Sequence, residues 1–155
     1  MYLLLLALLT TNPASPRGSV VQQPKHSEAV NDAFVNSLLD RVSYARLVAA
    51  HYPTPAKAPQ AGSGRMVSFS HGVNQFTCFK SPDNTFPASF IITSSEPLLA
   101  PVLTLGSTKS AILKRLGVSR SLDILQVSNL EAMALVTLYF QNDKLAKVTY
   151  GATID

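Results

Sequence analysis

Hydrophobic residues change their spacing along the chain, and the first spacing predicts a helix. Between residues 27 and 52 they recur every three or four positions, as on the buried face of an amphipathic helix. This apolar stripe consists of Val30, Phe34, Leu38, Val42, Ala45 and Ala49. Ser27 can cap the start of such a helix, and Pro53 must end it because proline has no backbone N–H to donate.

After residue 65 the spacing changes to two, which is typical of half-buried strands. The alternation predicts strands at 65–70, 73–80, 88–93, 122–127, 134–140 and 145–150. The sequence Ser-Pro-Asp-Asn at 81–84 predicts a turn. A short helix at about 107–116 interrupts the strands, and Gly117 can end it in a left-handed conformation.

The last two strands should form a hairpin whose register follows from burial. A three-residue loop over 142–144 places Phe140 opposite Ala146, Leu138 opposite Val148 and Val136 opposite Tyr150, all on one buried face. The other face then carries Thr137, Tyr139, Lys147 and Thr149. A two-residue turn would instead place Lys147 opposite Leu138 and bury a charge, so we expect the longer loop.

These elements predict an α+β fold with a mainly antiparallel sheet of about five or six strands, one long amino-terminal helix and one short helix. The long helix (27–52) is followed by a linker rich in proline and glycine (53–64), which separates it from an α+β domain at 65–151. We expect the helix to cover one face of the sheet, because an apolar sheet face left bare is unstable. The alternative is that its apolar stripe docks on a partner.

The amino terminus predicts export. Residues 3–9 are Leu-Leu-Leu-Leu-Ala-Leu-Leu, and small, turn-forming residues follow them. This pattern is typical of a secretory signal peptide at 1–15, with a flexible spacer at 16–26. No cysteine lies near the block, so a lipid-anchored form is not expected, and the chain should be released to the periplasm or the medium. The alternative is an apolar first helix of a cytoplasmic domain.

Composition narrows the function classes. Only 14% of the 155 residues are charged, and the net charge of +4 is spread along the chain rather than clustered, which argues against nucleic-acid binding. No apolar run is long enough to cross a membrane. The single cysteine excludes an internal disulfide and a cysteine-based zinc site.

The candidate reactive residues are few. Cys78 with His71 could form a nucleophile–base pair, although a cysteine between Thr77 and Phe79 is more typical of a core. The spacings of His26, His51 and His71 match no metal-binding motif, and we expect no cofactor. The nine acidic residues suggest no catalytic carboxylate pair.

The start of the short helix is a candidate anion site. Ser107, Thr108 and Lys109 follow Gly106 there, and backbone N–H groups at a helix start attract anions. The simpler interpretation is a capped helix start, because the pattern of a phosphate-binding loop is absent.

The region 102–151 resembles small α/β modules of bacterial envelope proteins. It has Leu-Gly-Ser-Thr-Lys at 105–109, Leu-Gly at 116–117 and a closing strand pair with a polar turn at 138–148. The resemblance is to outer-membrane assembly lipoproteins and β-lactamase-inhibitor-like domains. It implies a strand ending at the Gly-Ser pair, and a non-catalytic role in binding a protein or envelope component. We expect binding at Tyr139, Lys147, Thr137 and Thr149; the alternatives are a small hydrolase using Cys78 and a cytoplasmic structural domain.

Overall fold

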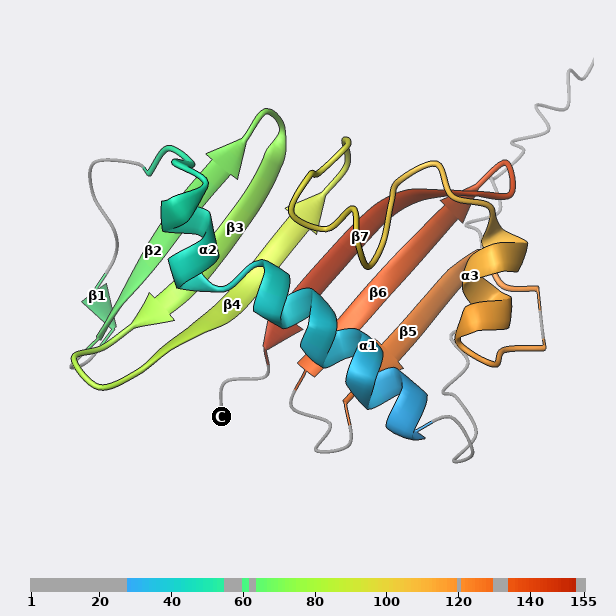
Figure 1. The fold of residues 1–155 in the computed structure, drawn as a ribbon, viewed down its shortest axis with the longest axis horizontal. Helices are drawn as coiled ribbons and strands as arrows, with labels where there is room; N and C mark the ends of the chain where they lie inside the picture. The colour runs from blue at the N-terminus through green and yellow to red at the C-terminus, as the bar shows by residue number, and fades with distance from the viewer. Residues whose placement is uncertain (1–27, 55–59, 62–63, 120, 130–133, 153–155) are drawn as a thin grey trace, which may run out of the picture.

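The computed structural model describes residues 28–54, 60–61, 64–119, 121–129 and 134–152. Within them one antiparallel sheet is crossed on one face by helices, so the predicted α+β class is confirmed (Figure 1). The predicted signal peptide (1–15), the spacer (16–26), Ser27 and His26 lie outside the described residues.

The sheet consists of six longer strands and one strand of two residues. They are β1 Gln60–Ala61, β2 Gly64–His71, β3 Asn74–Lys80, β4 Thr85–Ile92, β5 Ile124–Ser128, β6 Ala134–Gln141 and β7 Lys144–Ala152. Their order across the sheet is β1-β2-β3-β4-β7-β6-β5. Two three-stranded units, β2–β4 and β5–β7, are therefore joined where β4 pairs with β7.

The long helix is present but interrupted. α1 spans Glu28–Arg41 and α2 spans Tyr44–Ala49, and Ser43 between them has extended dihedral angles of −61° and 151°. The predicted uninterrupted helix is therefore wrong at this point. The break lets the chain change direction so that Leu47 is fully buried in place of the predicted Ala45 and Ala49, which are exposed.

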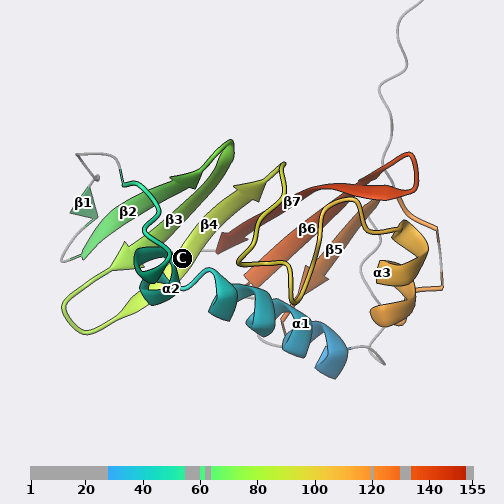
Figure 2. The ribbon, with the colours of Figure 1, turned by 45° about the horizontal axis from the view of Figure 1, so that its top comes forward.

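The helices cover what we call the inner face of the sheet. α1 contacts β5 and β6, and α2 contacts β4 (Figure 2). α3, Lys109–Arg115, lies near the β5 end on the same side, with Arg115 5.8 Å from the ring centroid of Phe34 in α1. The expectation that the long helix packs on the sheet is confirmed.

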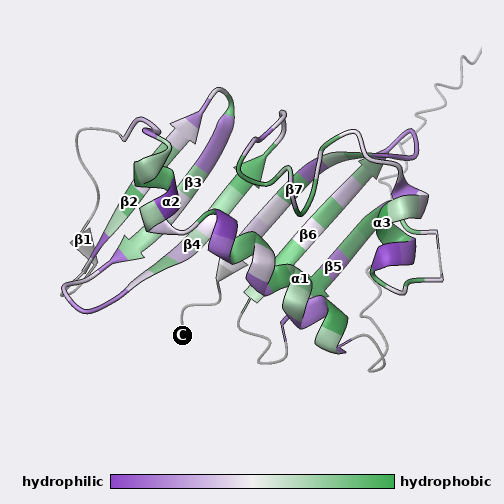
Figure 3. Cartoon of the chain, in the orientation of Figure 1, coloured by the Kyte–Doolittle hydropathy of each residue, from purple (hydrophilic) through white to green (hydrophobic). Residues whose placement is uncertain are grey.

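The core lies between these helices and the sheet. One row of directly paired, buried residues crosses six strands: Phe69, Phe76, Phe90, Tyr150, Val136 and Val127. Hydrophobic residues alternate with more polar ones along the strands, as the period of two predicts (Figure 3).

The predicted register of the last hairpin is confirmed except next to its turn. Leu138 pairs with Val148 and Val136 with Tyr150, as predicted, but Phe140 pairs with Leu145. The turn has only two residues, Asn142 and Asp143, and both have positive φ. A bulge next to Tyr139 takes up the extra residue, Ala146, and so keeps Lys147 off the buried face.

Two further segments differ from the predictions. Gln60 and Ala61, within the expected linker, form β1 against Arg65 and Gly64. Residues 102–105 form no strand; the adjoining Thr108 only makes an isolated bridge to Lys144. Gly117 does follow the short helix with a φ of +67°, in the left-handed conformation expected of a residue that ends a helix.

Candidate functional site

The face of the sheet opposite the helices is a broad surface with almost no charge. We call it the outer face and define it by three rows of directly paired residues. The first row is Ser70, Gln75, Ile91, Thr149, Thr137 and Gln126; the second is Ser68, Thr77, Ser89, Gly151, Leu135 and Ser128; the third is Lys147, Tyr139 and Ile124. Lys147 is the one charged residue in these rows. Hydroxyl and amide side chains dominate the other positions, so the surface offers many neutral hydrogen-bonding groups.

The four predicted binding residues lie together on the outer face. Thr137 pairs with Thr149, and Tyr139 pairs with Lys147, in adjacent positions of the β6–β7 ladder. The Lys147 Nζ lies 5.2 Å from the centroid of the Tyr139 ring, within the range of a cation–π contact. Thr137 is only 7% exposed, so the other three residues offer most of the contact surface.

A groove marks the far end of the outer face, at β2 and β3. It has a volume of about 430 Å³ and is lined by Pro53, Thr54, Ser68, Phe69, Ser70, Gln75, Phe76 and Thr77. The backbone N–H of Ser70 donates to the carbonyl of Pro53 at 3.1 Å, which fixes the wall of the groove against β2. No charged side chain of the described residues lines the groove, and the sequence analysis did not predict it. Its wall comes from a segment expected to be a linker.

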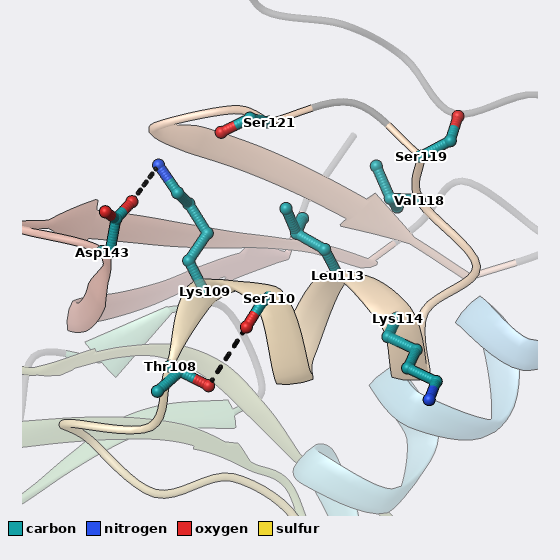
Figure 4. A pocket seen from close by; sticks show the side chains of 9 residues that line it. All are labelled: Thr108, Lys109, Ser110, Leu113, Lys114, Val118, Ser119, Ser121 and Asp143. Atoms are coloured by element: carbon teal, nitrogen blue, oxygen red, sulfur yellow. Dashed lines mark hydrogen bonds and ion pairs between the residues drawn. The ribbon is translucent and has the colours of Figure 1, made fainter.

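The predicted anion site is occupied by the protein's own carboxylates. The Lys109 Nζ lies 2.9 Å from Asp143 Oδ1 (Figure 4). It also lies 3.1 Å from Asp123 Oδ1. The hydrogen bond to Asp143, and then the one to Asp123, raises the pKa of Lys109. A cavity of about 680 Å³ adjoins this lysine, and Thr108 and Ser110 also line it. The lysine charge is thus already paired, and α3 is too short to act as a strong helix dipole.

Cys78 and His71 are not brought together. Cys78 pairs with Val67 in the β2–β3 ladder, whereas His71 belongs to the same strand as Val67 and lies four residues further along, about 13 Å away. The Cys78 thiol is 1% exposed, and burial raises its pKa to about 11. Such a thiol is poorly ionised at neutral pH, and its Sγ donates to the backbone carbonyl of Val42 at 3.9 Å.

The structure instead places His71 in a polar cluster that the sequence analysis missed. The buried Glu96 accepts hydrogen bonds from the Tyr52 hydroxyl at 2.5 Å and from Asn74 Nδ2 at 3.1 Å. His71 Nδ1 lies 3.2 Å from the same carboxylate, and its ring stacks on Tyr52 with centroids 4.7 Å apart. Burial, and then the contact with Glu96, raises the pKa of Tyr52 above its usual range.

The cluster joins three parts of the chain. Tyr52 follows α2, His71 and Asn74 flank the β2–β3 turn, and Glu96 lies in the loop that crosses the inner face. Asn74 was detectable in the sequence, because it occupies an inward position in phase with Phe76 and Cys78. Its partner, Glu96, lies 22 residues further along the chain, and no local sequence pattern connects the two residues.

The described residues contain no group of three or more His, Cys, Asp or Glu side chains that could hold a metal ion. None of the helices described is both long enough and apolar enough to cross a membrane. Comparison with protein-family models, curated proteins and solved structures found no match.

Proposed function

We propose that this chain is a small non-catalytic module that binds a protein or another component of the bacterial envelope through its outer face. The observation that carries the proposal is the row of uncharged residues across six paired strands, all of them polar except Ile91, next to a groove of about 430 Å³. A buried polar surface must be matched by hydrogen bonds, so a flat array of hydroxyl and amide groups favours a partner with complementary polar groups. The resemblance of residues 102–151 to envelope modules is the basis for naming an envelope component as the partner, although the strand that it implies before Gly106 does not form.

Site-specific crosslinking can test the outer face. A photoreactive amino acid at Thr149 lies in the middle of the outer face, whereas one at Val48, which is 48% exposed on α2, lies on the helical side. We expect the variant with the photoreactive residue at position 149 to give a crosslinked product with the partner, and the variant with it at position 48 to give none. Adding Ser70→Arg, which places a long cation in the same row of the outer face, should abolish the product without changing the unfolding midpoint.

Two results would contradict the proposal. One is the same crosslinked products from both positions, which would indicate contact without a preferred face. The other is a product from Thr149 that persists in the Ser70→Arg variant, since a partner seated on that row must meet the new side chain.

We further propose that the chain is exported. The support is the apolar block at residues 3–9, followed by small residues. The intact mass of the native protein should be measured separately in the soluble interior of the cell and in the exported fraction. A shortened mass in the exported fraction would support export, and a full-length mass found only in the interior would refute it.

A further inference from the structure

The edge of β5 that faces away from β6 has no strand partner among the described residues. β5 pairs with β6 on one side, and no described residue forms a backbone hydrogen bond with it on the other. At the opposite end, the edge of β2 is covered in part, because Ser70 donates to the Pro53 carbonyl and Gly64 and Arg65 pair with β1. The five residues of β5, Ile-Leu-Gln-Val-Ser, include no charge and no proline, which are the usual devices that keep an edge strand from pairing.

The direction of each backbone group in β5 follows from its pairing with β6. The Phe140 N–H donates to the Asp123 carbonyl at 2.8 Å, so the backbone groups of residue 123 face β6. Because these groups alternate along an antiparallel strand, those of Leu125 and Val127 also face β6. The N–H and C=O groups of Ile124, Gln126 and Ser128 therefore point out of the sheet, toward the open edge.

We propose that two copies of this chain pair through β5, antiparallel, around a two-fold axis at Gln126. In this register Gln126 lies opposite its own counterpart, and Ile124 lies opposite Ser128 of the second copy. Each of these pairs exchanges both of its backbone hydrogen bonds, so every outward-pointing group of the three residues is satisfied. The strand is thus complementary to itself, as a two-fold symmetric interface requires.

The side chains of β5 fit the same register. Leu125 and Val127 point to the inner face and are already fully buried within each copy, so the junction depends on the backbone bonds and on the outer-face side chains. Gln126 lies on the outer face, where the two amide side chains can hydrogen-bond to each other. Since the axis is perpendicular to the sheet, the helices of both copies lie on one side and the two outer faces form one continuous surface.

The expected dimer is a weak one. Five residues of edge strand bury less than the roughly 1,000 Å² of a stable interface. We therefore expect a reversible dimer with a dissociation constant between about 1 µM and about 1 mM. The net charge of +4 on each copy opposes association only modestly, because physiological salt screens charges beyond about 8 Å. The pairing goes beyond the proposed function, since it uses the edge of the sheet and leaves the outer face open.

The position of the axis provides the test. Gln126→Lys places two like charges directly opposite each other, and so does Gln126→Glu, whereas a mixture of the two variants pairs opposite charges. In sedimentation velocity of the full chain we expect a concentration-dependent dimer for the wild type, monomers for each variant alone, and a dimer again for the equimolar mixture. Val73→Lys, at a side chain that is 65% exposed on the distant β2–β3 turn, adds the same charge and should leave the dimer intact.

Gln126→Pro tests the backbone bonds independently. The N–H that proline removes points to the open edge, so no bond to β6 is lost, and the unfolding midpoint should stay close to that of the wild type while the dimer is lost. A wild-type chain that remains monomeric at about 1 mM, or variants at Gln126 that dimerise as well as Val73→Lys, would overturn the pairing. Neither result would affect the crosslinking expected at Thr149, so the two proposals can fail separately.

Discussion

The amide of Asn74 donates to the carboxylate of Glu96 at 3.1 Å, and the two residues are only 0% and 5% exposed. The Asn74 Oδ1 also accepts from the backbone N–H groups of Thr93 and Ser94, each at 3.0 Å. One buried side chain thus ties the end of β4 and the loop after it to the β2–β3 turn. The loop has no strand partner of its own there, so its conformation depends on these bonds.

Asn74→Ala should therefore destabilise the fold strongly. It removes the acceptor of the Thr93 and Ser94 N–H groups and one of the two groups that contact Glu96 Oε2, and it leaves a cavity where a fully buried side chain stood. We expect a loss of about 2–4 kcal/mol in the free energy of unfolding. Asn84→Ala, in the exposed turn before β4, is the matched control and should change it by less than about 0.5 kcal/mol. Urea denaturation of both variants measures the difference. Equal, small effects would show that the loop is held by other contacts.

A second prediction concerns the turn of the last hairpin. Asn142 and Asp143 have φ values of +50° and +58°, a pair of left-handed residues that fits the right-handed twist of a two-residue hairpin. Asn142→Gly should be tolerated, because glycine adopts this region without strain. Asn142→Val should cost about 1–2 kcal/mol in the free energy of unfolding, because a β-branched side chain disfavours it. Similar stability for the two variants, measured by thermal unfolding, would indicate a longer and looser turn.

The accuracy of the sequence-based predictions depended on the range of the interactions involved. Alternation along the strands depends on neighbours two residues apart, and it located the strands and placed Tyr139 and Lys147 on the same face. The hairpin loop was predicted one residue too long because the argument allowed only regular pairing. The bulge beside Tyr139 satisfies the same burial requirement with a shorter turn.

Interactions between distant segments could not be predicted in this way. The helix breaks at Ser43, and the break allows Leu47 to be fully buried. This burial depends on the tertiary structure, which the local spacing of hydrophobic residues does not report. Lys109 resembled an anion ligand because Asp123 and Asp143 are 14 and 34 positions away in the sequence and give no local signal. The groove beside Ser70 requires Pro53 to return to β2, and the composition of that segment indicated only a linker.

The Cys78 thiol should make stability depend on pH in the alkaline range. Burial raises its pKa from 9.0 to about 11, so between these values the unfolded chain releases a proton that the folded chain retains. The unfolded state then binds fewer protons, and the free energy of unfolding falls as the pH rises through this window. Each pKa unit corresponds to about 1.4 kcal/mol, so the fall attributable to this thiol is at most about 2–3 kcal/mol.

Comparison with Cys78→Ala isolates this effect from the other groups that titrate at high pH. The wild type should lose more stability than the variant between pH 9 and 11, and the two should have parallel pH profiles below pH 8. A thiol reagent at pH 8 should label the wild type only as fast as the protein unfolds. Rapid labelling of the folded protein would mean that the thiol is accessible, and it would revive the nucleophile hypothesis.

The last prediction concerns Gly64, which β2 needs for close packing. A Cβ at this position would lie 2.2 Å from the Phe79 ring, which itself stacks on Phe86 with centroids 5.1 Å apart. Gly64→Ala must displace the ring and disturb that stack, and we expect a cost of about 1–3 kcal/mol in the free energy of unfolding. Gly151→Ala is the matched control, because its new Cβ would meet no atom within 4 Å.

A double-mutant cycle separates this clash from a general effect of replacing glycine. With Phe79→Ala already in place, the space beside Gly64 is open, so Gly64→Ala should then cost little or even stabilise the strand, since alanine restricts the unfolded chain more than glycine does. The cycle is measured by urea denaturation of the four proteins. If the cost of Gly64→Ala were the same with and without the ring, the penalty would lie in the backbone of β2 and the contact with Phe79 would not explain it.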